Sequence, residues 1–174
     1  MGGNKPFGSI PASFWNLTGL TELGLSNMQL TELSEDIGKL SKLRIIYLGQ
    51  NKLTTMPQAI TTLKNLSVLG FASNQIKELP EDIGNLTELE SFACDYNLLE
   101  GLPDSFGNLL KLRKLEMQGN PFTSLPSTFG NLPSDCHVSL GDCKQLPSPP
   151  REVYKEGPQA IMTWFDERGG YGEK

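Results

Sequence analysis

The chain has 174 residues, of which 37% are hydrophobic and 20% charged, a balance typical of one soluble domain or of a repeat array. Its net charge of −5 comes from interspersed acidic and basic residues. No run of Lys or Arg forms a phosphate-binding stripe, so we expect no nucleic-acid partner. We also expect the chain to fold without a membrane.

Three cysteines, Cys94, Cys136 and Cys143, match neither a disulfide framework nor a zinc-binding pair in their spacing. We therefore expect neither a metal nor another cofactor. The first residues, Met1 to Pro6, do not form a basic segment followed by an apolar stretch. Because a signal peptide needs both, we expect a cytoplasmic protein.

The first regular feature along the chain is a leucine that recurs every 23 residues. This column holds Leu20, Leu43, Leu66, Leu89 and Leu112. Two further apolar columns follow, three and five residues later. They hold Leu23, Ile46, Leu69, Phe92 and Leu115, then Leu25, Leu48, Phe71, Cys94 and Met117. The alternation of period two predicts one short strand in each unit.

An asparagine column comes next, and its polarity sets it apart from the apolar columns. It holds Asn51, Asn74, Asn97 and Asn120. An inward-facing amide costs about 1–3 kcal/mol per unsatisfied group, so we expect these side chains to bond main-chain groups of neighbouring turns. Each unit then continues with L/M-P, as in Leu79-Pro80. Proline excludes a long helix on that side.

The full motif, L-x-x-L-x-L-x-x-N-x-L-x-x-L-P-x-x-I-G-N-L, resembles the leucine-rich repeat over roughly residues 4–149. Its length and its L-P and G-N-L elements are similar to repeats of Ras-associated scaffolds, plant Ras-group-related proteins, Roco-type proteins and bacterial repeat proteins. The resemblance implies an α/β fold, a right-handed solenoid. A parallel sheet would line the concave face, and short irregular or 3-10 segments the convex face, followed by a C-terminal helical cap.

Both ends depart from the regular unit. Phe14 and Leu17 occupy core columns of a preceding half-unit, so the first turn should expose core and an unpaired strand edge. We expect an upstream segment or a neighbouring molecule to cover it, and self-association through this edge is one form of that prediction. Met28 replaces asparagine and Ser34 replaces proline in the first full unit, whose turn should be less regular.

The C-terminal tail changes from repeat to helix. Residues 152–156 predict one helical turn, and Pro158 suits the first position of a second helix. Ile161, Trp164 and Phe165 then form one apolar stripe that should seal the last turn. The predicted organisation is a partial repeat (1–19), five full repeats (20–134), a degenerate repeat (135–150), a helical cap (151–168) and a flexible tail (169–174).

Catalytic chemistry finds little support in the residues. The single histidine, His137, follows Cys136 directly, and neighbouring strand residues point to opposite faces, which argues against a nucleophile–base pair. We expect no enzyme activity within these residues. Three N-x-S/T sequons begin at Asn16, Asn65 and Asn85, but the N-L element belongs to the repeat, so we interpret them as coincidental.

The outward residues of the strands vary while the core columns stay apolar, so they form the candidate binding surface. Ile45, Tyr47 and Val68 should form a small apolar patch with Tyr96 further along, because exposed aromatics favour protein contacts. Charged groups follow in later turns as Asp95, Lys114 and Glu116. Six strands would make a sheet roughly 25 Å wide, which suits an interface of about 800 Å² per partner.

These residues predict a module that binds a protein partner on its concave strand face, as part of a scaffold, signalling or effector protein. One alternative is a secreted or cell-surface recognition domain, which the sequons and the Gly8-Ser9-Ile10-Pro11 element favour. Another is the non-catalytic targeting region of a multidomain enzyme, such as a GTPase, a kinase or a ubiquitin ligase.

Overall fold

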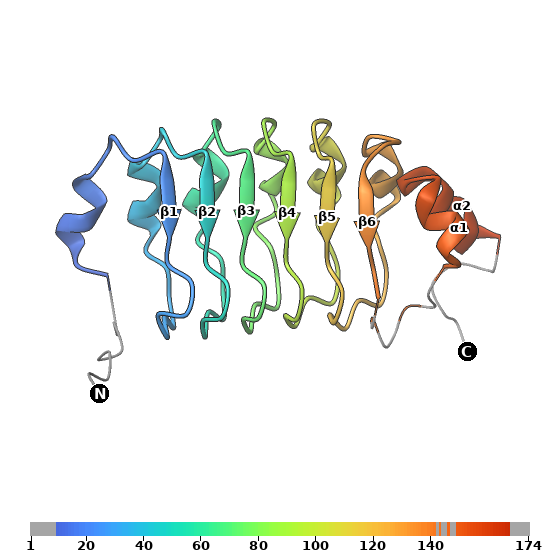
Figure 1. Cartoon of the computed structure of the whole chain (residues 1–174), viewed down its shortest axis with the longest axis horizontal. Helices are drawn as coiled ribbons and strands as arrows, with labels where there is room; N and C mark the ends of the chain where they lie inside the picture. Colours follow the sequence, from blue (N-terminus) through green and yellow to red (C-terminus); the bar gives the residue numbers. More distant parts are fainter. Residues whose placement is uncertain (1–9, 142, 144–145, 147–148, 168–174) are drawn as a thin grey trace.

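A computed structural model describes residues 10–141, 143, 146 and 149–167. Six three-residue strands lie side by side in one parallel sheet in chain order (Figure 1). They are β1 (Glu22–Gly24), β2 (Ile45–Tyr47), β3 (Val68–Gly70), β4 (Ser91–Ala93), β5 (Lys114–Glu116) and β6 (His137–Ser139). The structure therefore confirms the predicted solenoid with one strand per 23-residue unit.

The strand register equals the repeat length. Leu23 pairs with Ile46, and Ile46 with Leu69, each 23 residues further along the chain. Equivalent side chains therefore stack on one another, which makes the apolar columns one continuous core from Trp15 to Phe165. A single turn could not bury these residues by itself, so the stacking holds the fold together.

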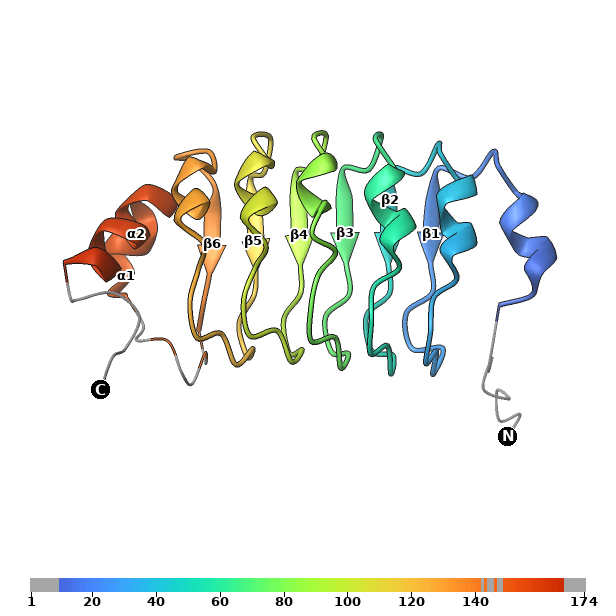
Figure 2. The same ribbon diagram turned by 180° about the vertical axis from the view of Figure 1, so that it is seen from behind.

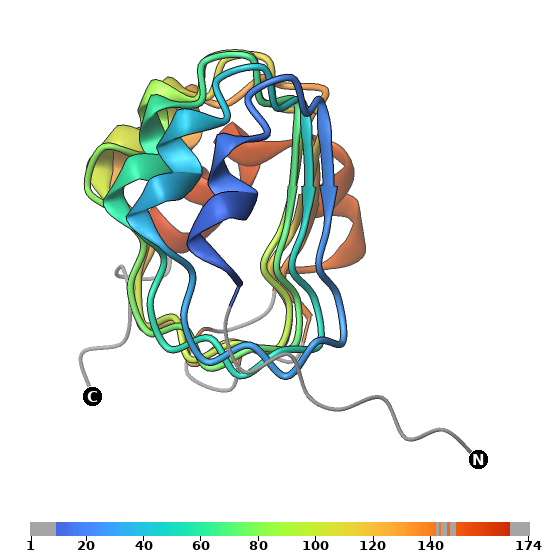
Figure 3. The same cartoon turned by 90° about the vertical axis from the view of Figure 1, so that its left-hand side faces the viewer.

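Short 3-10 helices lie on the side opposite the sheet (Figures 2 and 3). They are η1 (Ala12–Asn16), η2 (Glu35–Lys39), η3 (Gln58–Thr62), η4 (Ile83–Asn85), η5 (Asp104–Asn108) and η6 (Ser127–Asn131). Pro57 and Pro103 stand directly before η3 and η5, where the missing N–H costs nothing. Ser34, which replaces proline before η2, instead accepts a hydrogen bond from the Asp36 N–H at 3.1 Å.

The glycine of the G-N-L element allows neighbouring 3-10 helices to pack closely. A Cβ atom on Gly84 would lie 1.9 Å from the carbonyl oxygen of Ser105, and one on Gly107 would lie 2.3 Å from that of Thr128. No side chain fits at these distances. The glycine is therefore required by contact between turns, a reason that the sequence pattern alone did not supply.

The asparagine column forms the predicted ladder between turns. The Asn97 side-chain oxygen accepts from the Ile76 N–H at 3.0 Å, and its Nδ2 atom donates to the Phe71 and Cys94 carbonyls. The other three asparagines repeat this pattern. In the last turn Cys143 takes the position, and its Sγ atom lies 3.7 Å from the Met117 carbonyl oxygen.

Two α-helices close the C-terminal end: α1 (Arg151–Lys155) and α2 (Pro158–Asp166). The first begins one residue earlier than predicted, and Pro158 starts the second as expected. Ile161 and Phe165 are buried in the core, while Trp164 is half-buried against Phe165. α2 packs on η6, so the predicted stripe does cover the last turn.

The N-terminal half-unit differs from its prediction. Trp15 is buried, whereas Leu17, which the repeat register places in the core, is 50% exposed. Leu17 faces the end of the solenoid, where no described turn precedes it, while Trp15 occupies the column that contacts the following turn. Phe7 and the predicted flexible tail lie outside the described residues.

The first full turn is less regular, as predicted. Asn27 and Gln29 both adopt positive φ, at 58°, while the next turn has one such residue, Gln50. Met28 is 38% exposed between them. The Met28 side chain cannot bond the main chain as asparagine does, while the Met28 and Leu30 N–H groups both donate to the side-chain oxygen of Asn51 in the next turn.

Candidate protein-binding face

The face of the sheet that points away from the core is the candidate site, and we call it the strand face. It comprises the outward residues of the six strands and the second and third residues after each strand. Parallel pairing in register places equivalent residues in straight rows across this face. Side chains from different turns therefore lie next to one another, which a protein partner can contact together.

The predicted apolar patch is brought together by the register. Ile45 lies directly beside Val68, and Tyr47 lies beside Gly70. Ile45 and Val68 are half-buried, while Tyr47 is 50% exposed. A Cβ atom on Gly70 would lie only 3.3 Å from the Tyr47 Cδ1 atom, so the tyrosine ring lies over the glycine. The patch is flat and solvent-facing.

Tyr96 does not join this patch. Its backbone adopts a φ of 52°, and a Cβ atom on Gly119 would lie 2.5 Å from its Cδ1 atom. The ring therefore leans over the following turn, away from Tyr47, and stays 54% exposed. The structure places it against Gly119 rather than with Ile45 and Val68.

The charged residues lie at the end of β4 and on β5. Lys114 and Glu116 point to the same side of β5 and form an ion pair of 2.9 Å. Asp95 follows β4 and, against expectation, is only 8% exposed. Its Oδ1 atom accepts a hydrogen bond from the Gln118 N–H at 3.1 Å, and this contact draws the carboxylate into the face of the sheet.

Burial raises the pKa of the Asp95 carboxyl above its usual value of 3.8, because desolvation disfavours the charged form. The Gln118 N–H opposes this shift, repulsion from Glu116 adds to it, and Lys114 opposes it. The strand face thus carries two carboxylates beside one ammonium group. The sequence did not predict that Asp95 is buried, because the exposure of a residue on the strand face depends on the neighbouring turn.

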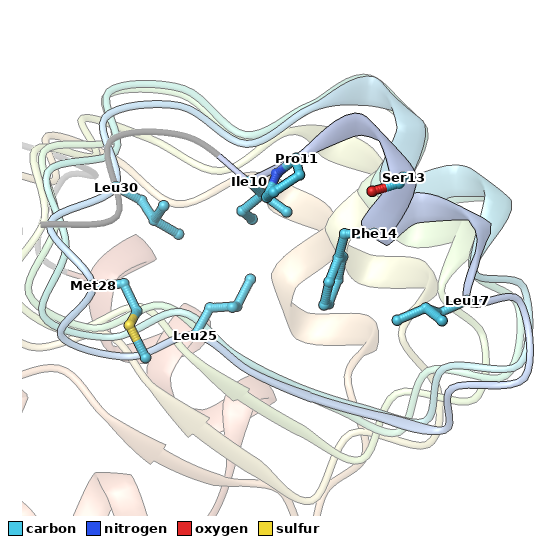
Figure 4. Close-up of a pocket in the computed structure, with 8 residues that line it drawn as sticks. All are labelled: Ile10, Pro11, Ser13, Phe14, Leu17, Leu25, Met28 and Leu30. Atoms are coloured by element: carbon cyan, nitrogen blue, oxygen red, sulfur yellow. The ribbon is translucent and has the colours of Figure 1, made fainter. Parts of the chain in front are cut away.

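An apolar pocket of about 500 Å³ opens at the N-terminal end of the solenoid, away from the strand face. Figure 4 shows Ile10, Phe14 and Leu25 pointing toward it. Leu17 and Met28 lie at its exposed margin. Among the described residues no turn covers this end, as the half-unit predicted, and self-association through it stays a prediction.

The three cysteines are buried. Burial raises the pKa of the Cys136 thiol to about 12, with Asp135 adding to the shift, and raises that of Cys94 well above its usual range. Cys136 is buried and His137 exposed, so the two point to opposite sides. Within the described part of the chain, no group of three His, Cys, Asp or Glu residues is arranged to hold a metal.

None of the helices that the structure describes has the length and apolar character needed to cross a bilayer.

Six parallel strands, opposed by 3-10 helices and tied by asparagines, define a leucine-rich-repeat solenoid. Family comparison agrees: residues 11–92 match a leucine-rich repeat region and residues 111–132 match a leucine-rich repeat. The chain is therefore a leucine-rich-repeat protein. The comparison with curated proteins found no match. The narrower relation to Ras-associated or Roco-type proteins stays a prediction.

Solved structures with the same architecture come from plants and bacteria. The ectodomain of the Arabidopsis thaliana receptor kinase GASSHO1/SCHENGEN3, in complex with CASPARIAN STRIP INTEGRITY FACTOR 2, is 34% identical with a TM-score of 0.70, over 77% of this chain and 17% of that one. The plant peptide hormone receptor RGFR1, in complex with RGF2, is 30% identical with a TM-score of 0.66, over 78% and 23%.

A bacterial example is a leucine-rich-repeat protein of Leptospira interrogans. It is 28% identical with a TM-score of 0.62, over 80% of this chain and 41% of that one. This chain therefore spans between 17% and 41% of the length of these three proteins.

Proposed function

We propose that this chain is a recognition module that binds a protein or peptide partner on its strand face. The observation that carries the proposal is the apolar patch of Ile45, Tyr47 and Val68, which the strand register brings together on the outward side of β2 and β3. None of these three side chains belongs to an apolar column of the core. Half-exposed aromatic and branched side chains offer contact area at low entropic cost.

The size of the sheet supports one partner of modest extent. Six strands at about 4.8 Å spacing make a face roughly 25 Å wide, which fits an interface of about 800 Å² per partner. Leucine-rich-repeat domains are generally non-catalytic binding modules, and two of the similar plant receptors were solved in complex with a second molecule. A non-catalytic binding role for this chain is in keeping with both facts.

The test is affinity capture from a lysate of the source cells, with bound proteins identified by mass spectrometry. The wild-type chain is compared with a Tyr47→Glu/Val68→Glu double variant. The control is Leu110→Glu, which removes an apolar residue that is 64% exposed outside the strand face. Thermal unfolding of all three chains shows whether each is folded.

We expect one or more partners to be captured by the wild type and by the control and lost from the double variant. A stably folded double variant that captures the same partners would contradict the proposal. Loss of capture by Leu110→Glu alone would move the binding site off the strand face.

A second candidate is an extracellular recognition domain. The observation in its favour is that Asn16, Asn65 and Asn85, which begin the three sequons, are all exposed. The similar plant proteins include a receptor ectodomain at 34% identity. Expression of the parent gene in its own cells, followed by intact-mass measurement before and after glycosidase treatment, separates the candidates. A mass loss on treatment favours the extracellular role over the cytoplasmic location predicted from sequence.

A further inference from the structure

Asp95 differs from the other residues of the strand face in being both charged and buried. It is the only acidic side chain among the described residues that is less than 9% exposed. The equivalent positions in the other turns hold Ser26, Gly49, Ala72, Gln118 and Gly141. The repeat therefore does not require a carboxylate at this position, and its presence is a particular property of the fourth turn.

The protein compensates this carboxylate only in part. The carboxylate is stabilised by the Gln118 N–H at 3.1 Å and by its own backbone N–H, and the nearby ammonium group of Lys114 is already bonded to Glu116 at 2.9 Å. Two carboxylates beside one ammonium leave one negative charge in a region with restricted access to water. Such a group gains more from an added cation than a fully solvated carboxylate does.

We propose that Asp95 and Glu116 receive a basic side chain, Arg or Lys, of an extended peptide whose apolar side chain rests on the Ile45, Tyr47 and Val68 patch. This inference rests on the proposed function and adds the chemistry of the partner. The exposed ring of Tyr96, the residue next to Asp95, offers an aromatic face of the kind that favours a cation. The chain's net charge of −5 attracts a basic partner at long range.

The geometry also sets the spacing of the two side chains. The patch spans β2 and β3, and the acidic pair lies after β4 and on β5, so the two are one to three strands apart. One to three steps of about 4.8 Å make about 5 to 14 Å, and an extended peptide advances about 3.3 Å per residue. The basic and apolar residues of the peptide should therefore lie within about four positions of each other.

The competing explanation is purely structural, with Asp95 serving only to bond the Gln118 N–H. Asp95→Asn distinguishes the two, because the amide oxygen can still accept this hydrogen bond while the charge is removed. Glu100→Gln is the matched control, since it neutralises an exposed carboxylate outside the strand face. Neither substitution changes side-chain size appreciably.

The probe is a phage-displayed library of random linear dodecapeptides, selected separately on the wild type, Asp95→Asn, Glu100→Gln and the Tyr47→Glu/Val68→Glu variant. We expect wild-type and Glu100→Gln selections to enrich an Arg or Lys within about four positions of an aromatic or aliphatic residue. Replacing that basic residue by Gln in a synthetic peptide should weaken binding to the wild type about tenfold. The same replacement should change binding to Asp95→Asn less than threefold.

Three results would overturn the inference. Peptides that depend on Tyr47 and Val68 but carry no basic residue would refute the cationic partner and leave the proposed function standing. Equal losses on wild type and Asp95→Asn would assign the basic residue to another site. Selection of no peptide that depends on the strand face would contradict both the inference and the proposed function.

Discussion

The carboxylate of Asp95 and the backbone N–H of Gln118 join neighbouring turns on the outward side of the sheet, with 3.1 Å between Oδ1 and nitrogen. The asparagines, such as Asn97, tie neighbouring turns from the inside through a neutral amide. A charged group in this role makes the stability of the fold depend on pH. The contact therefore links the candidate binding face to a measurable thermodynamic property.

Asp95→Asn should alter the dependence of stability on pH. Because the folded-state pKa of Asp95 is raised, the folded chain holds this proton more tightly than the unfolded chain does. Ionisation of the Asp95 carboxyl therefore lowers the free energy of unfolding as pH rises from about 3.8 through the raised pKa. We expect the variant to be at least as stable as the wild type near neutral pH and equal to it below about pH 3.8.

Urea unfolding across this pH range measures the effect. Glu116 and Lys114 interact with the Asp95 carboxyl, so neither can serve as a control. Glu100→Gln removes a carboxylate outside the strand face and therefore controls for general charge effects. A variant that loses stability at neutral pH would show that the charge itself stabilises the turn.

Gly84→Ala should destabilise the convex side. Its methyl group would lie 1.9 Å from the Ser105 carbonyl oxygen, so η4 and η5 would have to move apart. Overpacking of this kind costs about 1–3 kcal/mol of unfolding free energy. Gly101→Ala is the matched control, because a Cβ atom there meets nothing within 4 Å. Urea unfolding should show Gly101→Ala to be neutral or slightly stabilising, and equal losses in both variants would contradict the argument.

Cys143→Asn should stabilise the last turn by restoring the asparagine column. Asn120 accepts from Leu99, 21 residues before it, and position 143 has the same relation to Phe122. An asparagine oxygen there would accept from the Phe122 N–H, and Nδ2 would bond the Met117 carbonyl that the thiol now approaches. A gain of about 1 kcal/mol is expected. The melting temperature measures it, and a decrease would show that the last turn cannot hold the amide.

Asn97→Ala tests the same column in the opposite direction. It removes the acceptor of Ile76 and the donor of the Phe71 and Cys94 carbonyls in the middle of the core. Buried groups left unsatisfied cost about 1–3 kcal/mol each, so the loss should exceed that of an ordinary surface substitution. Thr123→Ala, which removes one exposed hydrogen bond, is the comparison. Similar losses in the two variants, measured by urea unfolding, would argue against the ladder.

Thiol labelling should separate the native from the unfolded chain. Cys94 is fully buried, and the pKa of Cys136 is about 12, so neither carries appreciable thiolate at mildly alkaline pH. Iodoacetamide followed by peptide mass spectrometry should leave both unmodified in the native chain and modify both in denaturant. Rapid native labelling of Cys94 would indicate that the fourth turn opens readily.

The pattern of the repeat was sufficient to predict the architecture. Leu43 and Leu66 belong to one column and are one repeat length apart in the sequence, and neighbouring strands pair with the same offset. Stacking the turns in this way buries every apolar column. The asparagine contacts followed for the same reason, since a buried amide must find main-chain partners. The apolar patch of Ile45, Tyr47 and Val68 also followed from the register.

Side-chain exposure at the ends and on the strand face depended on the tertiary structure. Leu17 occupies a core column yet is half-exposed, because burial there needs a neighbouring turn as well as the right residue. Tyr96 leans over Gly119, away from Tyr47, since glycine leaves that space open.

The solenoid could be predicted from the residues alone, because every unit repeats the same apolar and polar columns. The burial of Asp95 and the contact between Gly84 and Ser105 became apparent only in the folded chain. Both depend on how closely one turn approaches the next, which is a property of the packed array and not of any single unit.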